Sequence, residues 1–382
     1  MKILNIVGAR PNFMKIAPLI ESYRAYPHIE PVLVHTGQHY DEKMSDLFFR
    51  QLGIPEPDMN LDVGSGSHAV QTAAVMTAIE PVLQDQRPDA VLVVGDVNST
   101  IACGLVAVKL GIPLIHVEAG LRSFDRSMPE EINRILTDSI SEIFFCTEQS
   151  GVDNLLDEGI APERIHLVGN VMIDTLLRNR EKAEASGVLE EMGLRPEHYA
   201  VMTLHRPSNV DDPGAMARII DAMDSIQRDM PLVFPIHPRT EANLQRFGLS
   251  ARLHGMENLH LTPPSGYLDF LKLTANAAVV LTDSGGIQEE STILGVPCIT
   301  LRENTERPVT VKVGANQLAG NDTTRIIEAY RRARAQERAG WAPPPFWDGK
   351  AAERTVAAIN QWWEESYGKP RESGEVSASA GI

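Results

Sequence analysis

Acidic side chains follow two successive apolar runs in the first half of the chain. Asp96 comes directly after AVLVVG, and Glu118 comes directly after PLIHV. Short apolar runs without polar alternation are typical of strands buried on both faces of a parallel sheet, and ligands bind beyond the carboxyl ends of such strands. Asp96 alone could cap the next helix. Glu118 at the next strand end favours a pair of carboxylates that transfers protons on two sides of a substrate.

Two further acids, Glu130 and Glu131, open the stretch MPEEINRILTDSI. Pro129 suits the first turn of a helix and acidic side chains suit its positive end, so a structural role explains both glutamates. We expect at most one of them to be functional.

Three histidines stand in or after apolar runs. His205 follows the first run of the second half, beside Arg206. Because we expect this position to face the acids across a cleft, it favours anion binding or proton transfer. His237, in PIHPRT, has the same placement, although His-Pro-Arg could simply form a turn. His116 lies inside a run and is expected to be a hydrogen-bonded core histidine.

The stretch LTDSGGIQEE carries a serine, two glycines and two carboxylates. A nucleophile elbow needs glycines on both sides of the serine, whereas Ser284 has Asp283 before it and both glycines after it. Backbone amides at a helix start attract anions, and Gly285 and Gly286 let a phosphate approach closely. Glu290 lies four residues after Gly286, on the same helix face. The stretch therefore predicts a nucleotide site; stabilisation of the helix dipole would explain the carboxylates but not the paired glycines.

The stretch GSGSHA, residues 64–69, matches the G-x-G-x-x-A dinucleotide pattern. That fingerprint requires a long apolar strand immediately before it, and NLDV is a poor one. We expect a loop that opens a helix rather than a site for a nicotinamide cofactor.

The composition limits the possible partners. The chain has 382 residues, 43% of them hydrophobic, and a formal net charge of -16. This charge argues against a nucleic-acid or membrane surface, so local cations must hold any anionic ligand. Cys103, Cys146 and Cys298 lie far apart, which favours a reduced cytoplasmic protein over a disulfide scaffold or zinc site. No stretch reads as a signal peptide or membrane span.

Apolar runs alternate with amphipathic stretches throughout the chain and predict an α/β fold of two Rossmann-like doubly wound domains facing across a cleft. The expected segments are a first domain with the acids (1–173), a connecting helix and linker (174–198), a second, nucleotide-binding domain (199–350), a helix that docks back on the first domain (351–367) and a disordered tail (369–382).

The ordered set of motifs resembles one enzyme family. The motifs are GARPNFMKIAPL, TGQHYD, GDVNST, HVEAGLR, MPEEINR, LTDSGGIQEE and ENTERP. In this order they resemble the non-hydrolysing UDP-N-acetylglucosamine 2-epimerases, which share the glycosyltransferase-B architecture. The resemblance implies elimination of UDP with loss of the C2 proton, a glycal-like intermediate, and re-addition with a proton on the other face. It implies no redox cofactor and no metal, and we expect a homodimer because cyclic dimers are the commonest assemblies.

The same likeness assigns roles to residues that match the family motifs. The acid/base carboxylates and the histidine near the leaving phosphate are matched by Asp96, Glu118, Glu130 and His205. Substrate-binding cations are matched by Arg10, Lys15 and Arg307. The diphosphate cradle, the ribose contact and an aromatic position near uracil are matched by Ser284, Gly285, Gly286, Glu290 and Phe270.

The chain also departs from the family pattern. Many bacterial members have His-Arg-Arg-Glu-Asn where residues 205–209 read His-Arg-Pro-Ser-Asn, so a second arginine is missing. In those members this neighbourhood also binds a second, activating substrate molecule. Gln38 and His237 match two of its contacts.

Several functions compete with UDP-N-acetylglucosamine epimerisation. The TGQHYD and MPEEINRILTD forms are also similar to enzymes that epimerise UDP-2,3-diacetamido-2,3-dideoxy-glucuronate. A hydrolysing epimerase would release UDP and free sugar. A UDP-dependent glycosyltransferase would use the same cradle with an acceptor, and a nucleotide-sugar sensor would bind without turnover. The acids together with His205 favour an epimerase.

Overall fold

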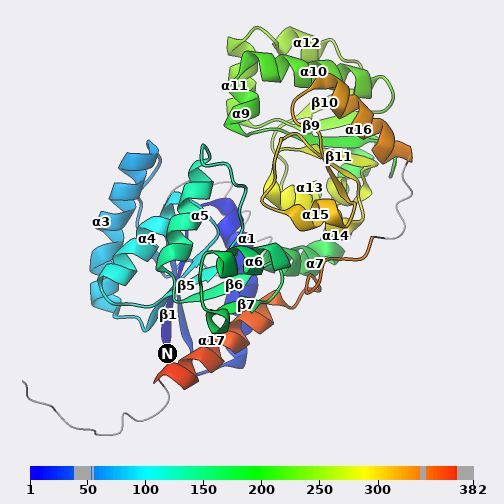
Figure 1. The fold of residues 1–382 in the computed structure, drawn as a ribbon. Coiled ribbons are helices and arrows are strands. Elements are labelled where there is room, and N and C mark those ends of the chain that lie inside the picture. Colours follow the sequence, from blue (N-terminus) through cyan, green and yellow to red (C-terminus); the bar gives the residue numbers. More distant parts are fainter. Residues whose placement is uncertain (38–52, 54–55, 336–340, 368–382) are drawn as a thin grey trace, which may run out of the picture.

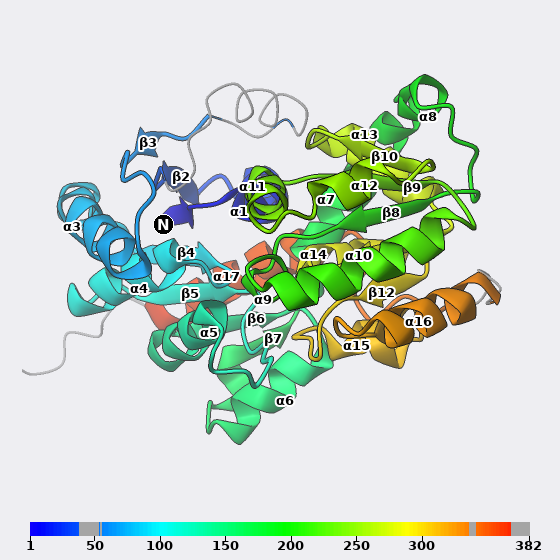
Figure 2. The same ribbon diagram turned by 90° about the horizontal axis from the view of Figure 1, so that it is seen from above.

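The computed structural model describes residues 1–37, 53, 56–335 and 341–367 of the chain. Two sheets, built only from parallel strands in these residues, lie in separate halves of the molecule (Figures 1 and 2). The predicted fold class, two doubly wound α/β units of glycosyltransferase-B type, is confirmed.

The first sheet has seven strands in the order β3-β2-β1-β4-β5-β6-β7. The strands are β1 (Lys2–Val7), β2 (Glu30–His35), β3 (Met59–Asn60), β4 (Ala90–Val94), β5 (Leu114–Val117), β6 (Ile143–Cys146) and β7 (Ile165–Leu167). The α-helices between them are α1 (Arg10–Ser22), α3 (His68–Gln86), α4 (Asn98–Lys109), α5 (Pro129–Ile140) and α6 (Gln149–Asp157).

The second sheet has six strands in the order β10-β9-β8-β11-β12-β13. The strands are β8 (Ala200–Thr203), β9 (Leu232–Pro235), β10 (Leu259–Thr262), β11 (Val279–Thr282), β12 (Cys298–Thr300) and β13 (Asn316–Leu318). Its helices are α9 (Pro207–Val210), α10 (Pro213–Gln227), α11 (Pro238–Arg246), α12 (Ser250–His254), α13 (Tyr267–Asn276), α14 (Gly285–Leu294), α15 (Pro308–Lys312) and α16 (Thr323–Ala335).

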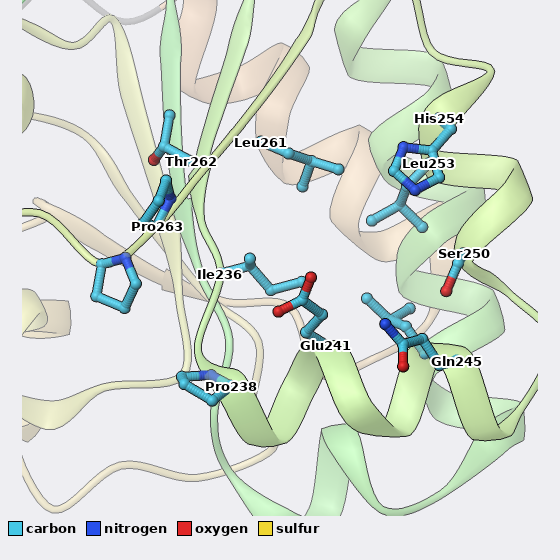
Figure 3. Close-up of a pocket in the computed structure, with 12 residues that line it drawn as sticks. Ile236, Pro238, Glu241, Gln245, Ser250, Leu253, His254, Leu261, Thr262 and Pro263 are labelled. Carbon is cyan, nitrogen blue, oxygen red and sulfur yellow. The ribbon is translucent and has the colours of Figure 1, made fainter.

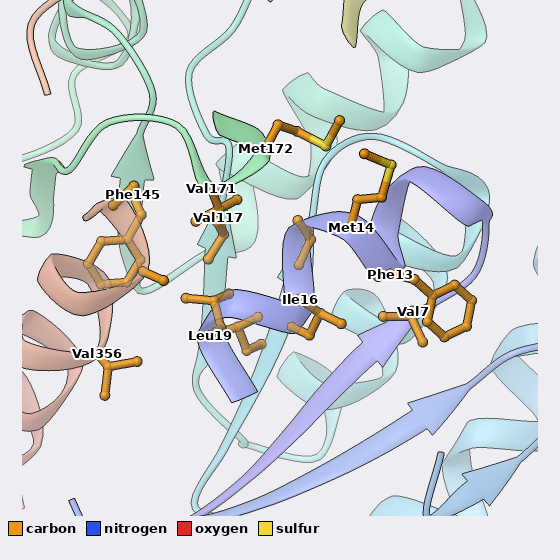
Figure 4. Close-up of a cluster of buried hydrophobic side chains, with 14 of the residues drawn as sticks. Val7, Phe13, Met14, Ile16, Leu19, Val117, Phe145, Val171, Met172 and Val356 are labelled. Carbon is orange, nitrogen blue, oxygen red and sulfur yellow. The ribbon is translucent and has the colours of Figure 1, made fainter. Parts of the chain in front are cut away.

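Alternate residues of β1 face opposite sides of the first sheet, and both sides are apolar. Ile3 and Val7 join the core beneath α1, whereas Leu4 and Ile6 pack toward α3 and α4. Figure 4 shows the α1 side, where Leu19 lies in the same cluster as Val356. Because both faces are covered, the strand sequence needs no polar alternation.

Three further helices lie outside the two strand series. They are α7 (Val171–Glu184), α8 (Val188–Glu191) and α17 (Ala351–Tyr367). Helix α7 packs against α1 of the first half and against α13 and α14 of the second. Helix α17 returns to the first half and packs against α1 and α7 (Figure 1). Asp174 of α7 accepts hydrogen bonds from the amides of Ala351 and Ala352, at 3.1 and 2.7 Å.

The strand order of each sheet reverses once, between β1 and β4 and between β8 and β11. These reversals are where doubly wound sheets bind ligands, beyond the carboxyl ends of the strands. Asp96 follows β4, His205 follows β8 and Ser284 follows β11. The topology therefore collects predicted residues from both halves at the positions suited to a ligand.

The G-x-G-x-x-A stretch at residues 64–69 ends in the first turn of α3, whose N-cap is Ser67. The preceding strand, β3, has two residues, so the strand that a dinucleotide fingerprint requires does not precede it. Among the described residues, no helix is long and apolar enough to cross a membrane.

Two glycines allow a test of a backbone contact near the carboxyl end of β5. Gly120 has φ of +76°, and a Cβ there would lie 2.2 Å from the carbonyl oxygen of Gly151. Gly111 has a similar φ of +74° and open space around it. We expect Gly111→Ala to lower the free energy of unfolding by about 1 kcal/mol, the cost of a left-handed alanine. Gly120→Ala should cost at least ~2 kcal/mol more, because the backbone must move.

Urea unfolding of both variants measures the difference. Equal losses in Gly120→Ala and Gly111→Ala would contradict the close approach of residues 120 and 151.

Candidate functional site

Lys15 brings α1 to the carboxyl end of β4. A Cβ on Gly95 would lie 3.0 Å from the ammonium nitrogen of Lys15. That ammonium forms an ion pair with Glu118, and both side chains are buried. Because a buried cation must be paired, Glu118 allows Lys15 to be buried at this position.

Glu118 has an unusual backbone conformation at the end of β5. Its φ is +72°, a region that non-glycine residues seldom adopt, and only 2% of the residue is exposed. The Oε2 atom of Glu118 contacts Lys15, and its Oε1 atom accepts a 2.6 Å hydrogen bond from Arg307. Left-handed strain in a buried, doubly paired acid is typical of a functional position.

Asp96 lies after β4 and pairs with Arg134 of α5, at 2.7 Å. Burial would raise the pKa of Asp96, but the charges of Arg134, Lys15 and Arg307 lower it below its usual value. Asp96 is therefore an ionised carboxylate at neutral pH, able to accept a proton.

The two glutamates at the start of α5 have different surroundings. Glu131 is buried and accepts hydrogen bonds from the amides of Ser123 and Phe124, both at 2.9 Å, and from Arg134 at 2.7 Å. Glu130 is partly exposed and lies 3.5 Å from Arg206 of the second half. Glu131 thus fixes a loop, and Glu130 is the one directed across to the other domain.

His205 is oriented by a buried acid, Asp283, which the sequence argument did not assign. The Nδ1 atom of His205 lies 3.0 Å from Asp283, which also accepts hydrogen bonds from the backbone amides of His205 and Arg206. Burial would raise the pKa of Asp283, but the contacts with His205 lower it. An Nδ1–H donated to Asp283 leaves Nε2 of His205 for another partner.

A cavity of about 220 Å³ lies beside His205 and Ser284 in the second half. Its walls include His237 and Phe270, so four predicted residues meet there. Its volume is below the ~300–1,000 Å³ of typical ligand pockets, so it can hold only part of a nucleotide sugar. The structure also makes His237 the N-cap of α11, where its ring accepts from the amide of Arg239.

The LTDSGGIQEE stretch joins β11 to α14. Ser284 is the N-cap of α14 and Gly285 is its first residue. A Cβ on Gly285 would lie 2.9 Å from the carboxylate of Glu306, so that carboxylate would have to move to admit a side chain. Gly286 has room on its outer side, and the first turn presents free amides that suit a phosphate.

Glu289 and Glu290, the acids at the end of this stretch, are both buried within α14. Burial, followed by the charge of Glu289, raises the pKa of Glu290 to about 8. Glu289 instead accepts a 2.7 Å hydrogen bond from Arg307. The two are therefore not solvent-exposed acids that stabilise a helix dipole.

Glu306 lies among four arginines drawn from both halves. Arg302 and Arg307 approach its carboxylate at 2.7 and 3.1 Å, and Arg134 and Arg206 at 3.7 and 3.8 Å. Burial would raise the pKa of Glu306, but these cations hold it well below its usual value. This cluster surrounds the start of α14 with local cations, as an acidic chain requires for an anionic ligand.

Arg307 connects the two halves. Its side chain bonds to Glu118 after β5 of the first sheet, at 2.6 Å, and to Glu289 of α14, at 2.7 Å. The acids beyond β4 and β5 therefore lie next to the glycine-rich start of α14. The arrangement can hold a diphosphate beside carboxylates that exchange protons.

Comparison with known proteins identifies the family of the chain. The UDP-N-acetylglucosamine 2-epimerase family model matches residues 21–360. The UDP-N-acetylglucosamine 2-epimerase of Methanocaldococcus jannaschii is 44% identical over 374 residues, which cover 97% of this chain and all of that one. This chain belongs to the UDP-N-acetylglucosamine 2-epimerase family.

A solved structure of the same archaeal enzyme and one further relative are informative about this epimerase chain. A crystal structure of the Methanocaldococcus jannaschii enzyme in complex with UDP-GlcNAc and UDP superposes on this chain with a TM-score of 0.89. The two chains are 44% identical, and the match covers 94% of this chain and all of that one. The UDP-2,3-diacetamido-2,3-dideoxy-D-glucuronate 2-epimerase of Pseudomonas aeruginosa is 42% identical over 335 residues, which cover 87% of this chain and 92% of that one.

Five buried polar residues of the site were not predicted as site residues: Arg134, Asp283, Glu289, Arg302 and Glu306. Asp283, Glu289 and Glu306 each stand next to a predicted residue in the sequence, and Arg134 lies four residues after Glu130, one helical turn away. Spacing could have suggested Arg134. The other residues could be recognised only from their contacts in the structure, because the predicted residues near them already accounted for the sequence motifs.

Some predictions concern parts that the structure does not describe. Gln38 lies outside the described residues, and the side chain of Arg10 is likewise not described. His116, the expected core histidine, is buried and hydrogen-bonded to Asp138 at 2.7 Å and to the carbonyl of Gly95 at 2.9 Å. Within the described ranges, no group of three or more His, Cys, Asp or Glu side chains could hold a metal ion.

A second cavity, of about 340 Å³, lies between α11, α12 and β10 (Figure 3). Apolar side chains such as Ile236 and Leu253 line much of it, with Glu241 and His254 among them. None of the predicted site residues lines this cavity. It is a different cavity from the one beside His205, although Pro264 lines both.

Removing the charge of Asp283 tests its role as the anchor of His205. Because its pKa is lowered in the folded state, its stabilisation is present above pH ~4 and is lost as the pH falls below that value. We expect Asp283→Asn to lower the free energy of unfolding by roughly 2 kcal/mol at pH 7, with a smaller difference at pH 3.

Asp221→Asn is the control, because Asp221 forms an exposed ion pair with Arg252 and should change stability by less than ~0.5 kcal/mol. Denaturant unfolding at both pH values gives the comparison. A loss in Asp283→Asn that is the same at pH 3 as at pH 7 would contradict the buried charge.

Proposed function

We propose that the chain interconverts the C2 epimers of UDP-N-acetylglucosamine, by elimination and re-addition of UDP without hydrolysis. The observation that carries this proposal is the Arg307 contact, which joins the predicted proton-transfer acid Glu118 to Glu289 of α14, the helix that begins at the predicted diphosphate cradle. Membership of the epimerase family and the UDP-GlcNAc complex of the Methanocaldococcus jannaschii relative support it.

The proposed chemistry divides between the two halves. C2 beside an acetamido group is not acidic by itself, so departure of UDP must build positive character at C1 while a carboxylate removes the proton. Asp96, Glu118 and Glu130 are the proposed acid/base carboxylates, and their individual roles are left open. Asp96, whose pKa is lowered, is available as an ionised base, and Glu118 contacts the two cations Lys15 and Arg307.

The second half is proposed to hold UDP. The amides of Gly285 and Gly286 with Ser284 receive the diphosphate, and Glu290 receives the ribose hydroxyls. Phe270 lies in the wall of the cavity proposed for uracil. The cations around Glu306, together with Lys15 and Arg10, stabilise the charge of the departing diphosphate. His205 is proposed to act beside the leaving phosphate.

Assembly, boundaries and location are part of the same proposal. We propose a homodimer, and exposed apolar side chains on neighbouring helices of the first half support it: Val70, Val108 and Leu136. Light scattering after size exclusion measures the mass. The domain segments 1–173, 174–198, 199–350 and 351–367 stay predictions, as do a cytoplasmic location and activation through Gln38 and His237.

Incubation with UDP-N-acetylglucosamine in deuterated water, followed by NMR, tests the proposed reaction. We expect the UDP-manno epimer to appear with deuterium at C2, because the carboxylate exchanges its proton with solvent before re-addition. Unchanged, unlabelled substrate would refute the proposal. Free UDP with free sugar would indicate hydrolysis, and turnover of the diacetamido-glucuronate substrate alone would indicate the other epimerase specificity.

Glu118→Gln tests the proposed division of labour. We expect the variant to lose C2 exchange by at least ~100-fold, because the amide cannot accept the proton. UDP affinity, measured by isothermal titration, should stay close to that of the wild type, since Glu118 belongs to the first half. Glu142→Gln, at an exposed acid of the same half, is the control and should exchange normally. Loss of UDP binding in Glu118→Gln would mean that Glu118 belongs to the nucleotide site.

A further inference from the structure

Glu148 is an acid that the reaction described above does not use. It follows β6, as Asp96 follows β4 and Glu118 follows β5, so three neighbouring strands end beside an acid. Only 3% of Glu148 is exposed. Its backbone caps α6, but its side chain makes no capping hydrogen bond to that helix.

The side chain of Glu148 reaches the second half of the molecule instead. Its Oε1 atom accepts a 3.3 Å hydrogen bond from the backbone amide of Val309 in α15. The same oxygen accepts a 2.6 Å hydrogen bond from the hydroxyl of Ser150. Within the part of the chain that the structure describes, the buried Oε2 atom has no hydrogen-bond partner. A carboxylate of the first half thus holds the first turn of a helix in the second.

The backbone that carries Glu148 is fixed on the first half. The carbonyl of Thr147 accepts a 2.8 Å hydrogen bond from the indole of Trp347, in the segment that leads into α17, which packs on the first half. Gly151 packs so closely on Gly120 that no side chain fits at residue 120. Glu148 is therefore a rigid support, and α15 is the element that it supports.

Residue 309 is two positions after Arg307, the residue that pairs with Glu118. Arg307 is also the N-cap of α15 and is followed by Pro308, so its backbone and the first turn of α15 are one unit. Holding the amide of Val309 fixes the backbone from which the Arg307 side chain extends toward Glu118.

We propose that Glu148 is a positioning residue, which holds α15 against the first domain so that Arg307 reaches Glu118 and the leaving diphosphate. This inference rests on the proposed epimerase function. Charged groups that face Glu148 are Arg307 and Glu289, and burial, the largest effect, raises its pKa to about 7. The contact with α15 thus involves a carboxyl group that titrates near neutral pH.

The test compares Glu148→Ala with Glu148→Gln in the full-length protein. Alanine removes the acceptor for the Val309 amide, and we expect kcat to fall by roughly 10- to 100-fold because Arg307 is misplaced. The UDP affinity should fall less than kcat, because Arg307 reaches only the diphosphate and the nucleotide cavity does not include α15. Glutamine keeps an acceptor oxygen and should recover most of kcat.

Two controls separate positioning from a general loss of structure. Ser150→Ala removes only the local hydroxyl and should keep kcat within about twofold of the wild type. In the Arg307→Met background, Glu148→Ala should slow turnover by no more than about twofold, since the residue through which it acts is absent. Losses that multiply in the double variant would overturn the proposal, and so would a normal kcat in Glu148→Ala.

A different result would refute the proposed function itself: a wild-type protein that does not epimerise the substrate. Rescue by glutamine is the readout that a merely structural role would not give. Because the protonated acid, like glutamine, keeps an acceptor oxygen for the Val309 amide, we expect the pH profiles of kcat to have the same shape in the wild type and Glu148→Gln. A kcat in Glu148→Gln as low as in Glu148→Ala would refute the role of the acceptor.

Discussion

The ion pair between Arg307 and Glu118 is the contact on which the site depends. Its donor and acceptor are 189 residues apart in the sequence and belong to different sheets. Both side chains are buried, and the attraction of Arg307 to Glu289, Glu118 and Glu306 keeps its pKa well above the usual value even though burial alone would lower it. Breaking such a pair leaves an uncompensated buried charge, so the two halves are held in one arrangement.

The arrangement also explains how an acidic protein can bind an anion. The net charge is -16, yet the described residues place Lys15, Arg134, Arg206, Arg302 and Arg307 within reach of one set of carboxylates. Each cation has a protein acid as its partner before any ligand is present. A diphosphate therefore meets preorganised cations that need little rearrangement, which is the form of electrostatic stabilisation most effective in enzymes.

The sequence predicted the strands of the two sheets and the polar residues that follow them well, because the apolar runs and the residues after them are local features of the sequence. Residues such as Leu4 and Val7 report their burial through the apolar run in which they stand, and Asp96 and Ser284 follow such runs directly. The sequence did not predict Asp283 as the partner of His205, since those residues are 78 positions apart. Glu306 was missed for a similar reason, because two of its four arginines, Arg134 and Arg206, lie far from it in the sequence.

The central claim is that Arg307 holds the acid-bearing half against the nucleotide-bearing half. Hydrogen–deuterium exchange with mass spectrometry, on the wild-type protein and Arg307→Met, tests this claim most directly. The account predicts faster amide exchange in both halves, at residues 305–311 around the substitution and at residues 118–124 across the cleft. Faster exchange confined to residues 305–311 would contradict it.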